Sequence, residues 1–313
     1  MIKELQNNSS VIRDFTFDKD IPRQNVFIFE LNQELKLLGE AANKEFREFN
    51  NYLEENNISL RQIINDEYQE QINMNLLISN IFNNLKEIMK YLLVVAHPDD
   101  EVLGAGASIW KWAKENNTVD VAIMCTEARA RAFRPGDEEL NSDLDESAKY
   151  LGINEKYEAT FPNIEMNTVP HLKLVQFIES AIKESEPDII ITHHPADTNN
   201  DHLQTSMACQ EAIRLFQRRP EIKRVKEFWY MEVPSCSEWA INGAMNLFRP
   251  NCYVEVGKEG IDAKIKALSM YRGVMRPYPH PRSVEYICGL ASVRGSQWGV
   301  NYAEAFEVAL RTY

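Results

Sequence analysis

Cysteine is scarce in this sequence, and its few copies are far apart. Their odd number and wide spacing show neither a disulfide framework nor a C-x-x-C zinc site. The pattern G-x-G-x-x-G follows none of the expected strands, which argues against a dinucleotide site. We therefore expect reduced thiols. The five cysteines in the 313 residues are Cys125, Cys209, Cys236, Cys252 and Cys288.

The chain is also short of basic charge and of long apolar runs. It carries 34 Lys and Arg against 47 Asp and Glu, a net charge of -13 at pH 7. This balance argues against binding to nucleic acid or to an anionic membrane. The opening residues, M-I-K-E-L-Q-N-N-S-S, hold no apolar signal core, and no segment approaches the length that spans a bilayer. The expected location is the cytoplasm.

Residues 1–88 differ in composition from the rest of the chain. They are rich in Asn, Glu and Gln and nearly free of Gly and Pro after Pro22. Their apolar residues recur at helical spacing, as at 28, 31, 35 and 38. We predict a helical N-terminal extension at 1–88 and a catalytic domain at 89–313. The extension also offers a surface for self-association into a homo-oligomer.

From residue 91 onward, apolar β-rich runs alternate with helical patterns. Such alternation predicts an α/β fold with a Rossmann-like, mostly parallel sheet flanked by helices. The expected strands are 91–95, 119–126, 189–192 and 228–235. One expected helix begins near Asp100. The others cover 144–151, 168–184, 203–216, 261–271 and 302–310.

The first polar cluster follows the run Y-L-L-V-V at 91–95, where the chain reads A-H-P-D-D-E. In open α/β sheets, ligands bind beyond the carboxyl ends of the strands. His97 and Asp100 can bind a divalent cation there, and Asp99 beside them can carry a proton. The alternative is a polar turn whose acids cap the next helix.

A second cluster follows the strand at 189–192 and contains three of the six histidines. His202 together with His97 and Asp100 makes a set of two histidines and one carboxylate, which is typical of catalytic zinc sites with open positions. Fe(II) also binds such sets, so zinc is a preference. Asp201, which precedes His202 in the sequence, is expected to orient a neighbouring metal ligand or the loop backbone. His193 and His194 are expected to be core histidines or to support the metal ligands.

Six motifs occur in order along the chain: A-H-P-D-D-E (96–101), F-P-N (161–163), T-H-H-P-x-D-x-N-x-D-H (192–202), E-V-P-S (232–235), P-H-P-R-S (279–283) and R-G-S-Q-x-G-V-x-Y-A-E-A-F (294–306). Together they resemble the PIG-L/LmbE-like family of deacetylases, over about residues 91–308. The resemblance implies zinc ligands His97, Asp100 and His202, with Asp99 as general base. It also implies removal of acyl groups, mostly acetyl, from amino sugars such as N-acetylglucosaminyl conjugates.

The chain departs from this family at Asn199, where several members carry a histidine that aids catalysis. Asparagine cannot shuttle a proton at neutral pH. The leaving amine must then take its proton from Asp99 or from another acid. His280 is a candidate for assisting the oxyanion or the leaving group, and a purely structural loop histidine is the alternative.

Three arginines follow the second expected strand, Arg129, Arg131 and Arg134. On an acidic protein, they can clamp a phosphate or carboxylate of the substrate. A solvated charged loop is the alternative. Arg282 and Arg294 are further candidate contacts, again with a plain ion pair as the alternative. Among substrate-binding residues we predict Arg131, Asn199 and Arg282.

The expected function is zinc-dependent hydrolysis of an N-acyl group, first of all N-acetyl, from a small amino sugar or sugar conjugate. Two alternatives stay open at this point. One is a metal-dependent amidase that acts on a thiol–sugar conjugate or another non-acetyl amide. The other is a non-catalytic metal-binding or assembly protein that retains the fold.

Overall fold

The computed structural model describes Asn51 and residues 88–127, 136–241 and 247–312. The chain divides into two compact units after Glu87. The predicted helical extension lies outside the described residues, apart from Asn51, and stays a prediction. The fold below is therefore that of the second unit.

A seven-stranded sheet forms the centre of this unit, in the order β3-β2-β1-β4-β5-β7-β6. The neighbours from β3 through β5 are parallel, whereas β7 runs antiparallel to both β5 and β6. The predicted α/β class with a mostly parallel sheet is confirmed. The strands are β1 Lys90–Val95, β2 Thr118–Ile123, β3 Lys156–Glu158, β4 Ile189–His193, β5 Glu227–Met231, β6 Cys252–Glu255 and β7 Ala303–Arg311.

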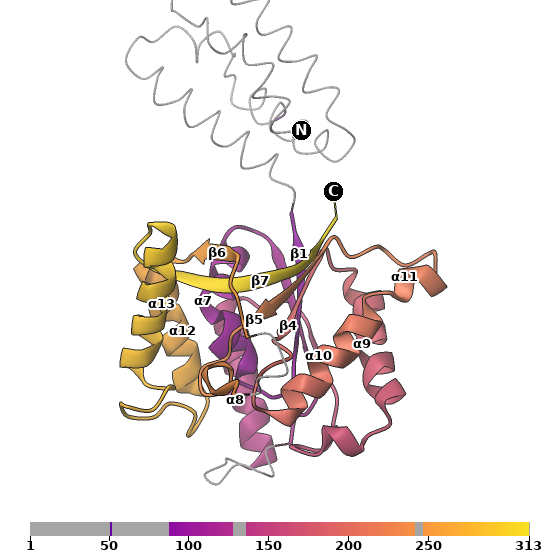
Figure 1. Ribbon diagram of the computed structural model, residues 1–313, viewed down its shortest axis with the longest axis horizontal. Helices are drawn as coiled ribbons and strands as arrows, with labels where there is room; N and C mark the ends of the chain where they lie inside the picture. Colours follow the sequence, from indigo (N-terminus) through magenta and orange to yellow (C-terminus); the bar gives the residue numbers. More distant parts are fainter. Residues whose placement is uncertain (1–50, 52–87, 128–135, 242–246, 313) are drawn as a thin grey trace, which may run out of the picture. The chain divides into compact units, whose positions relative to one another are not determined.

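Helices cover both faces of the sheet (Figure 1). On one face pack α7, α8, α12 and α13, and on the other α9 and α10. The helices are α7 Asp100–Lys114, α8 Asp137–Leu151, α9 His171–Ser185, α10 Asn200–Ala212, α11 Leu215–Arg218, α12 Gly257–Met270 and α13 Val284–Trp298, with short 3-10 turns at η1 Met166–Thr168 and η2 Ser237–Trp239.

The central strand β1 is apolar because it is buried on both faces. Tyr91, Leu93 and Val95 point into the core beneath α7, whereas Leu92 and Val94 point into the core beneath α9 and α10. Side chains alternate between the faces of a strand, so a strand covered on both sides needs an unbroken apolar run. This burial fixes the carboxyl end of β1, where the first polar cluster begins.

The predicted helix at 302–310 is wrong, because this segment is strand β7 at Ala303–Arg311. Its composition, A-E-A-F-E-V-A-L, favours helix, but the segment pairs with β5 on one side and β6 on the other. Pairing in the sheet outweighs intrinsic propensity here. Helix α13, at Val284–Trp298, was not predicted from the sequence; its N-cap is Ser283, whose hydroxyl accepts from Tyr286 N at 3.1 Å.

The short strands β3 and β6 were also missed, and the ends of several predicted helices are displaced. The helix expected at 144–151 begins at Asp137, and the one expected at 203–216 begins at Asn200 and ends at Ala212. Helix ends are the least certain part of a pattern-based assignment. None of these shifts changes the position of the polar clusters.

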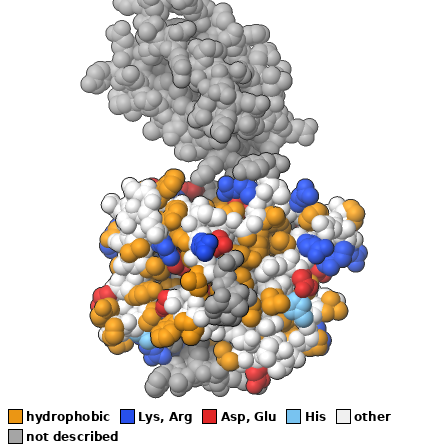
Figure 2. All heavy atoms as spheres, viewed as in Figure 1, with side chains coloured by type: hydrophobic (Ala, Val, Ile, Leu, Met, Phe, Trp, Pro, Cys, Tyr) orange, Lys and Arg blue, Asp and Glu red, His pale blue; other side chains and the backbone are white. Residues whose placement is uncertain are grey.

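The surface of this unit mixes residue types. Hydrophobic side chains lie between charged ones on the face shown in Figure 2, which is ordinary because roughly 55–60% of a folded protein's exposed surface is apolar. Within the described residues, every helix is too short or too polar to cross a lipid bilayer.

Close approach of α7 to the sheet depends on Gly104. A Cβ placed on this residue would lie 2.3 Å from Met231 Sδ of β5. We expect Gly104→Ala to destabilise the fold by about 1–3 kcal/mol, because overpacking forces side chains and backbone apart. Denaturant unfolding measures the change. The matched control is Gly289→Ala in α13, where a Cβ meets nothing within 4 Å; equal destabilisation of both variants would contradict the argument.

Candidate metal centre

The two polar clusters of the sequence meet at one edge of the sheet. Strands β1 and β4 are parallel neighbours, with Val94 paired to Thr192. The residues that follow them, 96–101 and 193–202, therefore leave the sheet side by side. This is the edge where open α/β sheets bind ligands.

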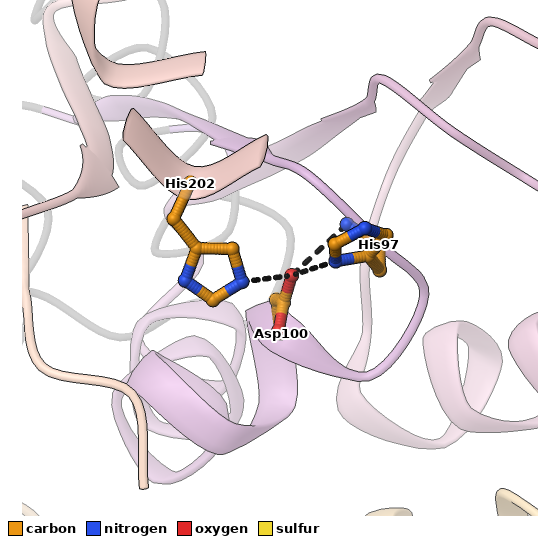
Figure 3. Close-up of side chains that lie close together, drawn as sticks. All are labelled: His97, Asp100 and His202. Atoms are coloured by element: carbon orange, nitrogen blue, oxygen red, sulfur yellow. Dashed lines mark hydrogen bonds and ion pairs between the residues drawn. The ribbon is translucent and has the colours of Figure 1, made fainter. Parts of the chain in front are cut away.

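His97, Asp100 and His202 converge in this place (Figure 3). Asp100 Oδ2 lies 3.2 Å from His97 Nδ1 and 3.3 Å from His202 Nε2. All three side chains are buried, and their donor atoms lie within 4.8 Å of one another. Asp100 Oδ2 also accepts from the backbone N–H of His97 at 2.9 Å. The structure thus brings together the three predicted ligands.

The far nitrogen of each imidazole contacts a buried carboxylate. His97 Nε2 lies 3.0 Å from Asp201 Oδ2, and His202 Nδ1 lies 3.0 Å from Asp197 Oδ2. A metal-binding histidine usually donates its other N–H in this way, which fixes the tautomer and turns a lone pair toward the ion. His97 Nδ1 and His202 Nε2 then face Asp100. This pattern fits a divalent cation.

The supporting carboxylates are themselves anchored. Asp201 accepts from Ile164 N at 2.5 Å and Met166 N at 3.1 Å, so it contacts an imidazole and the loop backbone as predicted. Asp197 Oδ1 accepts from Ser237 Oγ at 2.6 Å. The role of Asp197 was missed by the sequence analysis. Its place five residues before His202 in the second motif was the available signal.

A second group with metal-binding residue types, His193, Asp197 and His202, shares His202 with the first. In this group His193 Nε2 accepts from Ala96 N at 2.8 Å. Its Nδ1 must then carry the proton of the neutral ring and has no lone pair to offer. Burial, and then His202, hold the pKa of His193 well below its ordinary value, so the ring stays neutral. The geometry therefore favours the first group.

The two histidines at 193 and 194 are both buried supports, as expected. The ring of His193 stacks on that of His202 with centroids 3.7 Å apart. His194 Nδ1 accepts from Ala196 N at 3.1 Å, and its ring packs edge-on against Tyr230. They hold the loop and the ligand ring in place.

The electrostatics of the site favour a cation. Burial alone would raise the pKa of Asp100, but His202 and His97 hold it well below its ordinary value. Burial opposes the charge of His202, yet Asp100 and Asp197 raise its pKa to about 10. These two shifts favour a proton on His202 beside the Asp100 carboxylate. A divalent cation supplies positive charge there and displaces the proton, because metal ligands bind in their deprotonated form.

Asp99 stands beside these ligands in an unusual backbone conformation. It precedes α7 with φ 102° and ψ -23°, and its side chain is buried. Its N–H donates to Glu101 Oε2 at 3.1 Å, and Glu101 in turn accepts from the Tyr271 hydroxyl at 2.5 Å. Burial raises the pKa of Glu101 to about 8. Strained backbone of this kind collects at functional sites and needs support from its surroundings.

The predicted residues His280 and Arg282 form a chain of contacts to Asp99. Arg282 Nη1 lies 3.4 Å from Asp99 Oδ2, and Arg282 Nε donates to Ser235 Oγ at 2.9 Å. His280 is exposed, and its Nδ1 accepts from Arg282 N at 3.0 Å. Slight burial, followed by Arg282 and Arg276, lowers the pKa of His280. This direction favours the neutral form of the His280 ring.

The other predicted substrate residues have different outcomes. Asn199 is the N-cap of α10, and its side chain accepts from Asp201 N at 2.9 Å. This contact holds the helix start that carries His202. Arg131 lies outside the described residues, as do Arg129 and Arg134. Arg294 forms a bidentate pair with Glu232, at 2.7 Å and 2.5 Å.

Part of the chain is similar to known proteins. Residues 92–213 match the family PIG-L, described as GlcNAc-PI de-N-acetylase. The chain is 26% identical over 189 residues to the "Uncharacterized deacetylase YaiS" of Escherichia coli (strain K12), over 58% of this chain and 89% of that protein.

Two solved structures show the same fold. One is the N,N'-diacetylchitobiose deacetylase from Pyrococcus horikoshii, with a TM-score of 0.57, 20% identity, and coverage of 78% of this chain and 93% of that one. The other is GalB, the 4-carboxy-2-hydroxymuconate hydratase from Pseudomonas putida KT2440, with a TM-score of 0.57, 20% identity, and coverage of 72% and 98%. A deacetylase and a hydratase thus share this architecture, so the fold alone does not decide the reaction.

The family match begins inside β1 and ends just after α10, and so contains both polar clusters. Each motif that carries a converging side chain lies within it. Residues 92–213 therefore match the model of the PIG-L family, the family that the sequence motifs resemble.

Proposed function

We propose that this protein is a metal-dependent N-deacetylase that hydrolyses the N-acyl bond of an amino sugar or sugar conjugate. The observation that carries the proposal is the convergence of His97 Nδ1, Asp100 Oδ2 and His202 Nε2, with Asp99 buried beside them. The deacetylase description of the PIG-L family and the name of YaiS support the reaction class.

The donor set fits zinc, with Fe²⁺ as the alternative. A cation held there supplies a Lewis acid that polarises a carbonyl oxygen and lowers the pKa of water. Asp99 then takes one proton from the attacking water. The new C–O bond forms at the acyl carbon, and the C–N bond breaks as the proton passes from Asp99 to the amine. The products are a carboxylate and a free amino sugar.

The residues around Asp99 suit the remaining tasks. Arg282 places its positive charge beside the Asp99 carboxylate. We assign to His280 the stabilisation of the oxyanion or the leaving group, because it is exposed and joined to Arg282. Preorganised donors at a developing charge are usually a large term in catalysis. Arg131 and Asn199 remain proposed substrate contacts.

The substrate class follows from the relatives. The family description names a GlcNAc conjugate, and the Pyrococcus horikoshii protein is named for N,N'-diacetylchitobiose. Both are N-acetylated glucosamine compounds. We therefore place N-acetylglucosaminyl compounds first among the substrates, ahead of thiol–sugar amides with other acyl groups.

The test is release of acetate by the metal-loaded full chain. N-acetylglucosamine, N,N'-diacetylchitobiose and the N-formyl analogue of each are offered in parallel, and acetate or formate is measured together with the new amine. We expect equal amounts of acid and amine from at least one of them, and none after chelation. Release that is independent of the metal, or an amine without acid, would contradict the proposal.

A further inference from the structure

Helix α7, which carries Asp100, is broken in its first half. Ala105 has φ -142° and ψ 15°, values outside the helical range, so two helical segments meet at this residue. A break of this kind interrupts the i→i−4 hydrogen bonds and leaves backbone groups to be satisfied by others. The groups concerned are a carbonyl before the break and N–H groups after it.

A buried ion pair fills the break. Lys264 of α12 donates to the Leu103 carbonyl at 2.7 Å, and Glu304 of β7 accepts from Ala107 N at 3.2 Å and Ser108 N at 2.7 Å. The two side chains also bind each other, with Lys264 Nζ 2.6 Å from Glu304 Oε1. Both are nearly inaccessible to solvent. Helix α7 packs against both α12 and strand β7, which lie near one another in Figure 1.

The charges match the ends of the two helical segments. The ammonium of Lys264 lies at the carboxyl end of the first segment, and the carboxylate of Glu304 at the amino end of the second. Helix dipoles favour this arrangement. Gly106 leaves room for it, since a Cβ there would lie 3.2 Å from Lys264 Cγ.

Stability alone does not account for a buried ion pair, because apolar residues of similar volume often stabilise a core at least as well. An unbroken helix would also satisfy its own backbone groups. The Lys264–Glu304 pair has a more specific consequence. It determines the direction in which the first segment of α7 points.

That segment leads directly to the site. Asp99 O accepts from Leu103 N at 2.8 Å, and the carbonyl of the same Leu103 is the group that Lys264 holds. Asp100, within this one turn, contacts both imidazoles. A change in the orientation of the turn would move the carboxylates of Asp99 and Asp100 together.

We propose that Lys264 and Glu304 are positioning residues, which set the first turn of α7 and thereby the metal geometry at Asp100. This inference rests on the proposed function. Glu304 belongs to the A-E-A-F motif, to which no role was assigned from the sequence. Its role is to act through the backbone of α7, without touching metal or substrate.

The test is Co²⁺ titration of the full chain, followed by visible absorption. We expect Glu304→Gln to bind Co²⁺ about 10-fold more weakly, the lower end of the range for supporting partners of metal ligands, and with a changed spectrum. The matched control is Asp188→Asn. Asp188 is also a buried carboxylate that accepts from a backbone N–H (Lys90) and pairs with lysine, but it precedes β4, at the opposite edge of the sheet.

Asp188→Asn should lose stability yet keep the wild-type Co²⁺ affinity and spectrum. If Glu304→Gln does not fold, Glu304→Asp keeps the charge on a shorter arm, and the same spectral change is expected. A folded Glu304 variant with wild-type affinity and spectrum overturns the inference. Failure of the wild-type chain to bind Co²⁺ instead overturns the proposed function.

Discussion

Replacing Asp99 by asparagine is expected to lower turnover by about 10²–10⁴-fold, the usual contribution of a general acid or base, while the metal content stays unchanged. Asparagine has the same shape but cannot take a proton from water. It also tolerates positive φ better than most residues, so the backbone at φ 102° is preserved. Turnover is measured with the substrate found in the acetate assay, and metal by elemental analysis.

The control for this substitution is Asp120→Asn in β2. Asp120 is buried and accepts from Glu155 N at 3.1 Å and Ser185 Oγ at 2.6 Å, in the first half of its strand. It tests what the loss of a buried carboxylate does by itself. We expect wild-type turnover from this variant once it is folded. Near-normal turnover in a metal-loaded Asp99→Asn protein would remove Asp99 from the mechanism.

The sequence predicts the ligand cluster because parallel strands end at a common edge. Once 91–95 and 189–192 are identified as buried parallel strands, the polar residues that follow them must lie near one another. His97, Asp100 and His202 meet for that reason. These strands can be identified from the sequence because burial on both faces requires continuous apolar runs.

The contacts that support the cluster are not predictable in the same way. Glu304 reaches Ala107 across 197 positions of the chain, and the residues between them hold no periodic signal that pairs the two. The same limit explains β7, whose helix-favouring composition is overruled by pairing with β5 and β6. The tautomer of His193 depends on Ala96 N, a backbone group that every sequence offers.

Replacing His202 by alanine is expected to remove the metal, from about one ion per chain to nearly none, because two ligands from one four-residue segment make an incomplete site. His202 is the ligand that comes from the second strand end. Without it, only His97 and Asp100 of the proposed ligands would remain, and Asp197 would lose its imidazole partner. Elemental analysis of the purified and the zinc-reconstituted protein measures the loss.

Two further variants distinguish the effect of losing a metal ligand from the effect of changing a residue near it. His194→Asn changes a buried histidine of the same loop that contacts Ala196 and Tyr230, and it should keep its metal. Asp201→Asn removes only the carboxylate behind His97, so affinity should fall by about 10–100-fold while saturating zinc still fills the site. The expected order of loss is therefore His202, then Asp201, then His194. Full metal content in His202→Ala would mean that the two strand ends do not form one site, because the only ligand from the second cluster would then be dispensable.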